Sequence, residues 1–214
     1  MEYESLRARM VERLVDEGYI LSENVRRAFE AVPRELFVPS EYRARSYVDM
    51  PLPIGEGQTI SAPSMVAIML EVSDLSEGLN TLEIGAGSGY NACLIAQIVG
   101  DDHLVTIERI HTVYMQAKEN LTRCSKAVDV VHGDGTEGWP AKAPYDRIII
   151  TAAAPSLPNP LKEQLKVGGK LIAPVGKTAG FQTLTVAIKQ PDGSFKEKRF
   201  GACAFVPLIG TYGF

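Results

Sequence analysis

Residues 82–90, LEIGAGSGY, place three glycines at alternate positions directly after a short apolar run. An apolar strand that turns at glycines and continues as an apolar helix is typical of the ligand edge of an α/β sheet. Because glycine has no side chain, a ligand can lie against the bare backbone of such a turn. The motif predicts a ligand site at the carboxyl end of a parallel strand. It leaves open whether the ligand carries a phosphate.

Strands and helices are predicted to alternate in the middle of the chain. Strand character occurs at residues 81–84, 103–107, 128–131, 147–151 and 170–174. Helical character occurs at residues 90–99 and 112–123 and near residues 160–165. This alternation is typical of a parallel sheet that is covered on both faces. The sequence therefore predicts a doubly wound α/β fold.

The end of the chain departs from this alternation. Residues 182–189 and 195–205 have strand character, and the turn sequence PDGS at 191–194 joins them. Since no helix separates them, they are predicted to form an antiparallel hairpin at the edge of the mostly parallel sheet.

The N-terminal region is predicted to be a helical extension. Apolar residues recur there at helical spacing, at Leu6, Met10 and Leu14. Ser22 is placed to cap a second helix, and residues 47–60, rich in proline and glycine, are expected to be extended. Ser61 is predicted to be the N-cap of an apolar helix that has Pro63 in its first turn.

No linker or repeat divides the chain, so a single domain is predicted for residues 1–214. Residues 1–75 would form the helical part and the active-site segment. Residues 76–214 would form the core and the C-terminal hairpin.

The composition excludes several classes of protein. Hydrophobic residues make up 45% of the chain and charged residues 22%, as in ordinary soluble domains. The net charge of −4 gives no electrostatic reason to expect a nucleic acid partner. The sequence has neither a membrane-spanning apolar run nor the apolar core of a signal peptide. Its three cysteines lie far apart, without metal-like spacing, so we expect a cytoplasmic protein without a metal site.

The spacing of the glycines argues against a dinucleotide ligand. The dinucleotide fingerprint is G-x-G-x-x-G, whereas Gly85, Gly87 and Gly89 are spaced G-x-G-x-G. The bulky Tyr90 takes the position of the fingerprint's third glycine. Glu83 would repel a pyrophosphate and attract a cationic amino group. S-adenosyl-L-methionine, which has an ammonium, a sulfonium and no phosphate, is the favoured ligand; a tight turn without a ligand is the alternative.

Two further acidic positions follow successive strands. Glu108 ends the second predicted strand, where a carboxylate can accept both ribose hydroxyls of a bound nucleoside. Asp134 and Gly135 follow the third strand, where an adenine amino group would arrive. Each has a simpler explanation, since Glu108 could be an exposed acid and Asp-Gly is a common turn. Together with the glycine loop they predict a nucleoside site.

Longer motifs accompany these residues: VPRELFVP (32–39), PLPIGEGQTISAPSMVA (51–67), TLEIGAGSGYNACLIA (81–96), TIERI (106–110), GDGTEGWPAKAPYDRIIITAAAP (133–155), QLKVGGKLIAPVG (164–176) and FVPLIG (205–210). With them the chain resembles the protein-L-isoaspartate (D-aspartate) O-methyltransferase family. The glycine loop occurs in many methyltransferases, whereas GQTIS and GDGTEGWP are more specific. The resemblance implies a Rossmann-like fold of the class I methyltransferase type.

The resemblance also implies an activity. Enzymes of this family transfer a methyl group from S-adenosyl-L-methionine to the α-carboxylate of L-isoaspartyl residues, releasing S-adenosyl-L-homocysteine. The methyl ester closes to a succinimide, and this step begins the repair of the damaged protein. The implied partners are therefore damaged proteins and peptides that contain isoaspartyl residues. The oligomeric state is left open.

The family pattern assigns roles to individual residues of this chain. It implies that Ser61 is catalytic and that Thr59 and Ser61 bind the substrate. The implied cofactor-binding residues are Gln58, Thr59, Ile60, Ser61, Glu83, Gly85, Ala86, Gly87, Ser88, Gly89, Glu108, Arg109, Asp134 and Gly135. In one departure, this chain has Ser64 where the family often has histidine, so no imidazole role is implied there.

Three other functions are less well supported by the sequence. Nucleic acid amino-methyltransferases typically carry an N/D-P-P-Y/F tetrapeptide after the fourth strand, where this chain has TAAAPSLP. A nicotinamide-dependent oxidoreductase is disfavoured by Glu83 and Tyr90, and a non-catalytic binding module by the presence of GQTIS. The sequence does not decide whether FVPLIG binds a peptide in strand fashion or packs on the core.

Overall fold

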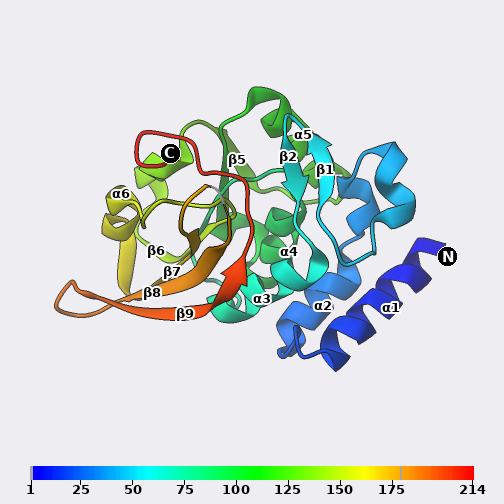
Figure 1. Ribbon diagram of the computed structural model, residues 1–214, viewed down its shortest axis with the longest axis horizontal. Helices are drawn as coiled ribbons and strands as arrows, with labels where there is room; N and C mark the ends of the chain where they lie inside the picture. The colour runs from blue at the N-terminus through cyan, green and yellow to red at the C-terminus, as the bar shows by residue number, and fades with distance from the viewer. Residues whose placement is uncertain (1, 179) are drawn as a thin grey trace.

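A seven-stranded sheet runs through the centre of the molecule, whose computed structural model describes residues 2–178 and 180–214 (Figure 1). The strand order is β5-β4-β3-β6-β7-β8-β9. The strands are β3 (Thr81–Ile84), β4 (Leu104–Glu108), β5 (Asp129–His132), β6 (Tyr145–Ile150), β7 (Leu165–Val175), β8 (Gln182–Lys189) and β9 (Phe195–Cys203). Strands β3 to β7 pair in parallel, and β8 and β9 are antiparallel. The predicted mostly parallel α/β fold with a C-terminal edge hairpin is confirmed.

Strand β3 lies where the winding of the sheet reverses. It pairs in parallel with β4 on one edge and with β6 on the other. All four of its residues are buried. Because the connections that leave β3 and β6 diverge, a crevice opens at the carboxyl ends of these strands. The glycine loop that follows β3 therefore lies at the topological switch point, at the carboxyl end of a parallel strand as the sequence predicted.

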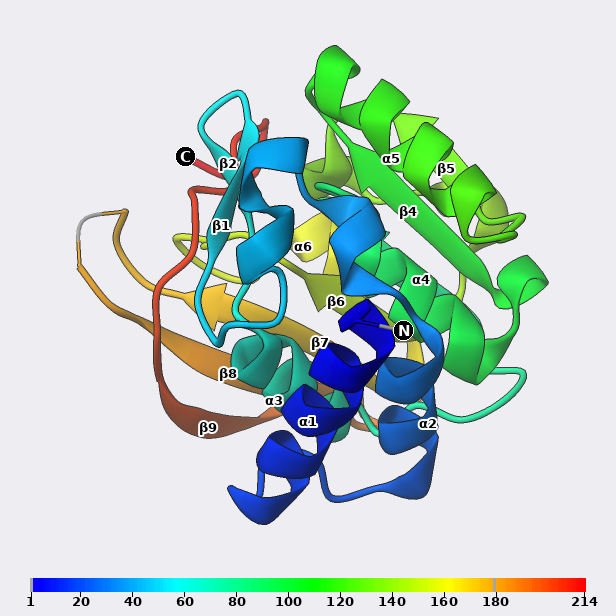
Figure 2. The same ribbon diagram turned by 90° about the vertical axis from the view of Figure 1, so that its right-hand side faces the viewer.

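Helices cover the two faces of the sheet unequally. The larger apolar core lies under α3 (Pro63–Ser73), α4 (Tyr90–Val99) and α5 (His111–Arg123). Two more helices, α1 (Glu2–Asp16) and α2 (Glu23–Ala31), form an outer layer on that side (Figures 1 and 2). The short α6 (Asn159–Glu163) and nearby loops cover the other face. None of the helices formed by the described residues combines the length and apolarity that a membrane crossing requires.

The passage expected to be extended contains a small hairpin. Strands β1 (Leu52–Gly55) and β2 (Gln58–Ile60) pair antiparallel, separate from the main sheet. Glu56 and Gly57 form its turn, with φ angles of 52° and 69°. Two successive residues with positive φ are typical of a tight hairpin turn. Figure 2 shows this hairpin beside the C-terminal segment, above the helical layer.

The predicted role of Ser61 as a helix cap is wrong. The N-cap of α3 is Ala62, with φ −55° and ψ 142°. Pro63 at the first helical position disfavours a helical conformation for the residue before it, so the helix begins one residue later than expected. A distant side chain takes over the capping, because Asp49 Oδ1 accepts a hydrogen bond of 2.9 Å from the Ser64 N–H.

Ser22 lies at the predicted N-cap position, but the capping hydrogen bond expected of its side chain is not formed. Ser22 is the N-cap of α2, and its side chain makes no capping hydrogen bond. Its hydroxyl instead donates to Glu71 Oε1 at 2.9 Å, which ties the start of α2 to α3. Short 3₁₀ helices complete the fold: η1 (Arg34–Phe37), η2 (Ser40–Arg45), η3 (Asp101–His103), η4 (Gly135–Glu137) and η5 (Pro140–Lys142).

Candidate active site

A cavity of about 1030 Å³, counted with its opening to solvent, lies at the carboxyl ends of β3, β4 and β6, and we call it the central cavity. Eleven of the fourteen predicted cofactor-binding residues line it: Gln58, Thr59, Ile60, Ser61, Gly85, Ala86, Gly87, Ser88, Glu108, Arg109 and Gly135. The other three, Glu83, Gly89 and Asp134, are not part of its lining. The fold thus gathers most of the predicted site around one cavity, and what these residues bind remains a prediction.

The glycine loop is fixed to the sheet by its backbone. The Gly85 N–H donates to the Ile107 carbonyl at 2.8 Å. Gly85 has a φ of 96°, and a Cβ at this position would lie 2.5 Å from Thr151 Oγ1. Gly89 has a φ of 86°, and its Cβ would lie 3.2 Å from the Ala117 carbonyl of α5. Gly89 therefore allows α4 to pack against α5, while Gly85 keeps the loop close to β6.

Glu108 is held rigidly at the edge of the central cavity. Its Oε2 accepts a hydrogen bond of 3.0 Å from the Gly87 N–H, and its Oε1 accepts one of 2.9 Å from the Ile110 N–H. The residue is only 7% exposed and lines the cavity. Each carboxylate oxygen has lone-pair capacity for a second donor. This arrangement suits a pair of neighbouring hydroxyls, as the sequence predicted for a ribose.

Glu83 lies behind the glycine loop. Its carboxylate is fully buried and accepts hydrogen bonds from Asn91 Nδ2 at 2.8 Å and Thr106 Oγ1 at 2.5 Å. Burial raises the pKa of Glu83 to about 7, although the hydrogen bonds from Thr106 and Asn91 oppose this rise. The nearby charge of Glu108 raises the pKa further. Any attraction between Glu83 and a cationic ligand would therefore act through the wall of the cavity, without direct contact.

Asp134, which the sequence suggested as an adenine contact, is also bonded within the fold. Its Oδ1 accepts hydrogen bonds from the Thr136 N–H and hydroxyl, and its Oδ2 accepts one of 2.7 Å from the Thr211 N–H. Burial disfavours the charged form, but the bonds from Thr211 and Thr136 outweigh it and lower the pKa of Asp134. Its neighbour Gly135 does line the cavity. Asp134 thus ties the C-terminal segment to the end of the cavity where the sequence predicted the adenine.

The segment that contains Ser61 forms a second wall of the cavity. Residues 58–61 line it, so Thr59 and Ser61 lie around the same space as Glu108. Ser61 is half-buried, and its hydroxyl makes no hydrogen bond to any residue that the structure describes. Its backbone carbonyl accepts a hydrogen bond of 2.8 Å from Arg34 Nη2. The hydroxyl is thus available to a substrate, while the backbone behind it is held in place.

A third wall comes from the C-terminal segment. Residues 205–209 line the cavity, and Ala153 anchors them by accepting from the Leu208 N–H and donating to the Val206 carbonyl, both at 2.8 Å. Leu208 is also buried in the smaller apolar core. Both suggestions for FVPLIG thus find support in its position: the segment packs on the core and borders the cavity.

Sequence reasoning missed several lining residues. Thr151 and Asn91 line the cavity, as do Val66 and Met69 of α3. Thr151 directly follows β6 at the ligand edge, so its position in the chain was a usable signal. Asn91 follows the glycine loop by two residues, but its orientation depends on α4. Nothing in the apolar pattern of α3 distinguishes residues that face the cavity from those that face the core.

The charges around the cavity argue against a pyrophosphate ligand. Arg109 is the sole lysine or arginine among the lining residues, whereas Glu108 lies in the wall and Glu83 behind it. Two neighbouring carboxylates repel phosphate oxygens and attract ammonium or sulfonium groups. A cationic nucleoside without a phosphate therefore fits the residues present.

Comparisons with known proteins agree with this geometry. The family model for protein-L-isoaspartate(D-aspartate) O-methyltransferase matches residues 5–213. A protein-L-isoaspartate O-methyltransferase of Pyrococcus horikoshii is 57% identical over 206 residues, covering 96% of this chain and 93% of the relative. The one of Hyperthermus butylicus is 52% identical and covers 99% and 91%.

Two solved structures extend the comparison. One protein-L-isoaspartate O-methyltransferase superposes with a TM-score of 0.88 at 31% identity, covering 97% of this chain and 67% of that chain. A Plasmodium falciparum structure, described as a putative enzyme of this kind in complex with S-adenosyl-L-homocysteine, has a TM-score of 0.82 at 25% identity and covers 97% and 98%. With the match extending over residues 5–213, the chain belongs to the protein-L-isoaspartate(D-aspartate) O-methyltransferase family.

Proposed function

We propose that the central cavity is where a methyl group passes from S-adenosyl-L-methionine to the α-carboxylate of an L-isoaspartyl residue. The observation that carries this proposal is the meeting of two features in one cavity. Glu108 and the glycine loop offer a site for a cationic nucleoside, and the free hydroxyl of Ser61 lies in a second wall of the same space. Family membership supplies the substrate class.

The cofactor supplies an activated methyl group on its sulfonium, and the residues of the chain bind and orient it. In our assignment, Glu108 accepts the ribose hydroxyls and residues 85–88 hold the methionine part through their backbone. Gly135 borders the adenine, while Asp134 secures the C-terminal segment beside it. Residues 58–61 cover the cofactor on the substrate side.

The proposed reaction needs no general base. A model aspartyl carboxyl has a pKa of about 3.9, so the attacking carboxylate is already ionised at neutral pH. Catalysis then comes from alignment of the carboxylate oxygen with the methyl group, an effect that contributes roughly 7–11 kcal/mol in well-oriented systems. Ser61 and Thr59 act as hydrogen-bond donors that fix the carboxylate. The hairpin β1–β2 and residues 205–209 exclude water from the reacting atoms.

The biological role follows from the chemistry of the product. A methyl ester beside a peptide N–H closes to a succinimide, whose hydrolysis returns part of the material as normal aspartate. The partners are therefore proteins and peptides with isoaspartyl damage. We further propose that the chain acts as one domain in the cytoplasm without nucleic acid partners; three free cysteines and the net charge of −4 support this setting.

The direct test is methyl transfer into an isoaspartyl peptide, compared with a peptide of the same sequence that has normal aspartate. We expect the isoaspartyl peptide to be methylated and the aspartyl peptide to be inert. The measurement is the incorporation of labelled methyl groups, together with formation of S-adenosyl-L-homocysteine. Equal rates on both peptides, or methylation of neither, would contradict the proposed function.

Replacement of Ser61 should separate catalysis from stability. Since Ser61 is not the cap of α3, Ser61→Ala should change the free energy of unfolding by less than about 0.5 kcal/mol. The value of kcat/KM for the isoaspartyl peptide should fall about tenfold or more, which corresponds to about 1.4 kcal/mol. Ser22→Ala is the matched control. It loses the bond to Glu71, so it should cost about 1 kcal/mol of stability and leave kcat/KM unchanged. A fully active Ser61→Ala enzyme would remove Ser61 from the site.

Replacement of Glu108 should weaken cofactor binding. Glu108→Ala removes the acceptor for the ribose hydroxyls, and hydrogen bonds to a charged group contribute about 1.5–3 kcal/mol. The Kd for S-adenosyl-L-homocysteine should therefore rise by roughly 10- to 150-fold in calorimetric titrations. Glu119→Ala, on the exposed face of α5, is the control and should bind normally. An unchanged Kd for Glu108→Ala would show that the cavity holds the nucleoside differently.

Cofactor affinity should depend on pH through Glu83. The pKa of this carboxyl is about 7, so it is neutral below that pH and negative above it. Its attraction for the ammonium group of the ligand is consequently absent at pH 5.5 and largely present at pH 7.5. We expect the affinity for S-adenosyl-L-homocysteine to increase by roughly tenfold over this interval, about the effect of one nearby charge. Glu83→Gln should flatten the profile, and a wild-type affinity that is constant with pH would refute this role.

A further inference from the structure

Arg34 is a buried charge without an obvious structural explanation. Within residues 2–178 and 180–214, four buried side-chain atoms lack a hydrogen-bond partner: Arg13 Nη2, Arg34 Nη1, Tyr90 Oη and Asn91 Oδ1. Tyr90 and Asn91 line the central cavity, and Arg34 packs against Tyr90, with Cζ 4.9 Å from the centre of the Tyr90 ring. Unsatisfied buried groups are rare in native proteins, so the pair Arg34 and Tyr90 beside this cavity calls for a functional reason.

The guanidinium of Arg34 links the Ser61 segment of the cavity wall to the end of η2. Nε donates to the Ser46 carbonyl at 2.7 Å, and Nη2 donates to the Ser61 carbonyl at 2.8 Å. Arg34 is fully buried, so this fork is shielded from water. The planar guanidinium fixes both carbonyls in one geometry, which a lysine cannot do. Arg34 therefore determines where the backbone of Ser61 lies.

The positive charge of Arg34 is not balanced by a neighbouring acid. It forms no ion pair with any carboxylate of the described residues, whereas burial of a charge normally requires a partner. Burial lowers the pKa of Arg34, and neighbouring Tyr90 and then Asp49 oppose that change only in part. Asp49 itself is engaged at the start of α3, where it accepts from the Ser64 N–H. Among the described residues, no carboxylate is bonded to the guanidinium that holds Ser61.

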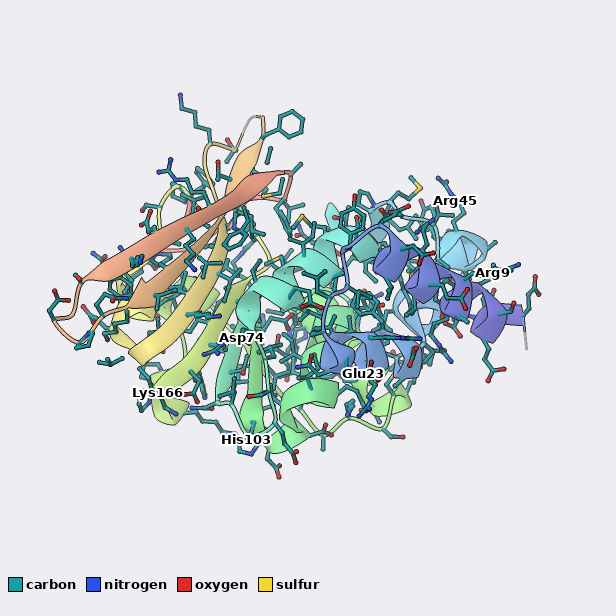
Figure 3. The ribbon with its side chains drawn as sticks, turned by 90° about the horizontal axis from the view of Figure 1, so that it is seen from below. Arg9, Glu23, Arg45, Asp74, His103 and Lys166 are labelled. Atoms are coloured by element: carbon teal, nitrogen blue, oxygen red, sulfur yellow. The ribbon has the colours of Figure 1, made fainter. Side chains whose placement is uncertain are left out.

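A second arginine provides a comparison at the other end of α3. Arg147 Nε donates to the Ser73 carbonyl at 2.5 Å, and its Nη2 donates to the Asp74 carbonyl at 3.0 Å. This clamp is at the amino-terminal edge of the sheet, where Arg147 pairs with Thr81, and Figure 3 labels Asp74 at the end of α3. Unlike Arg34, Arg147 has an acid nearby, since Asp74 Oδ2 lies 3.7 Å from Nη2. Arg34 and Arg147 each donate to two backbone carbonyls. Of the two, Arg34 at the active-site end of α3 has no ion pair with a carboxylate of the described residues.

We propose that Arg34 is a positioning residue for the substrate carboxylate, an inference that rests on the proposed function. Its fork holds Ser61 by the carbonyl, so that the hydroxyl stays directed to the cavity. Its unbalanced charge favours an anion beside that serine. The anion is the isoaspartyl α-carboxylate, which supplies the negative charge that the folded chain leaves out.

The test compares two peptides that differ only in charge. One is an isoaspartyl peptide, and the other carries a primary carboxamide in place of the α-carboxylate. Their Kd values are measured by calorimetry with S-adenosyl-L-homocysteine bound. The wild type should prefer the carboxylate, and Arg34→Gln should lower this preference about tenfold, or 1.4 kcal/mol. A purely structural role would weaken binding of both peptides equally and leave the preference unchanged.

Two further variants complete the experiment. Arg34→Lys keeps the charge and loses the fork, so it should retain the preference for the carboxylate while kcat falls, because Ser61 is less well fixed. Arg147→Gln should lower the melting temperature without changing the preference. If Arg34→Gln does not fold, wild-type kcat in Arg34→Lys overturns the proposal. The proposal is also overturned if Arg147→Gln lowers the preference for the carboxylate as much as Arg34→Gln does. A wild type that methylates no isoaspartyl peptide would instead refute the proposed function.

Discussion

The pairing of β3 on both of its edges controls the geometry of the site. Its neighbours β4 and β6 run parallel to it, so three strands end together at one edge of the sheet. The hydrogen bond from the Gly85 N–H to the Ile107 carbonyl fixes the glycine loop to β4. The Gly87 N–H in turn donates to Glu108 and fixes its carboxylate. The proposed ribose acceptor is therefore set by the sheet itself and not by a mobile loop. Without the reversal of winding at β3, the glycine loop and Glu108 would not meet at one crevice at the edge of the sheet.

The rest of the cavity is built from segments that are distant in sequence and are held by a few polar contacts. Arg34 fixes the Ser61 segment, Ala153 anchors the C-terminal segment, and Asp134 holds its last residues. Each contact joins a covering segment to the rigid core. In the proposed function, the sheet provides the cofactor side and the covering segments provide the substrate side.

The fold could be predicted from the sequence because its signals are local. Alternating apolar segments and the spacing of the glycines lie within a few residues of each other, and they placed β3, α4 and Glu108 correctly. The error at Ser61 arose where a distant contact decides the structure. Asp49, and not Ser61, accepts the hydrogen bond from the first turn of α3. The bond between Asp134 and Thr211, across 77 positions of the chain, also could not be read from local signals. Strand β7 begins at Leu165, earlier than predicted, because Leu165 pairs there with Tyr145. The two consecutive glycines of β7 have weak strand propensity, so the sequence did not indicate this early start.

The distribution of charge around the cavity suits the reaction that we propose. Carboxylates lie on the proposed cofactor side, at Glu83 and Glu108, and the buried cation Arg34 lies behind Ser61. A cationic sulfonium and an anionic carboxylate would thus each approach a wall of opposite sign. Transfer of the methyl group neutralises both reactants, so charge decreases on the way to the transition state. A water-poor cavity favours such a step, because water stabilises the separated ions more than it stabilises the less charged transition state. The walls must therefore attract the ions enough to bind them and still exclude the water that would hold them apart.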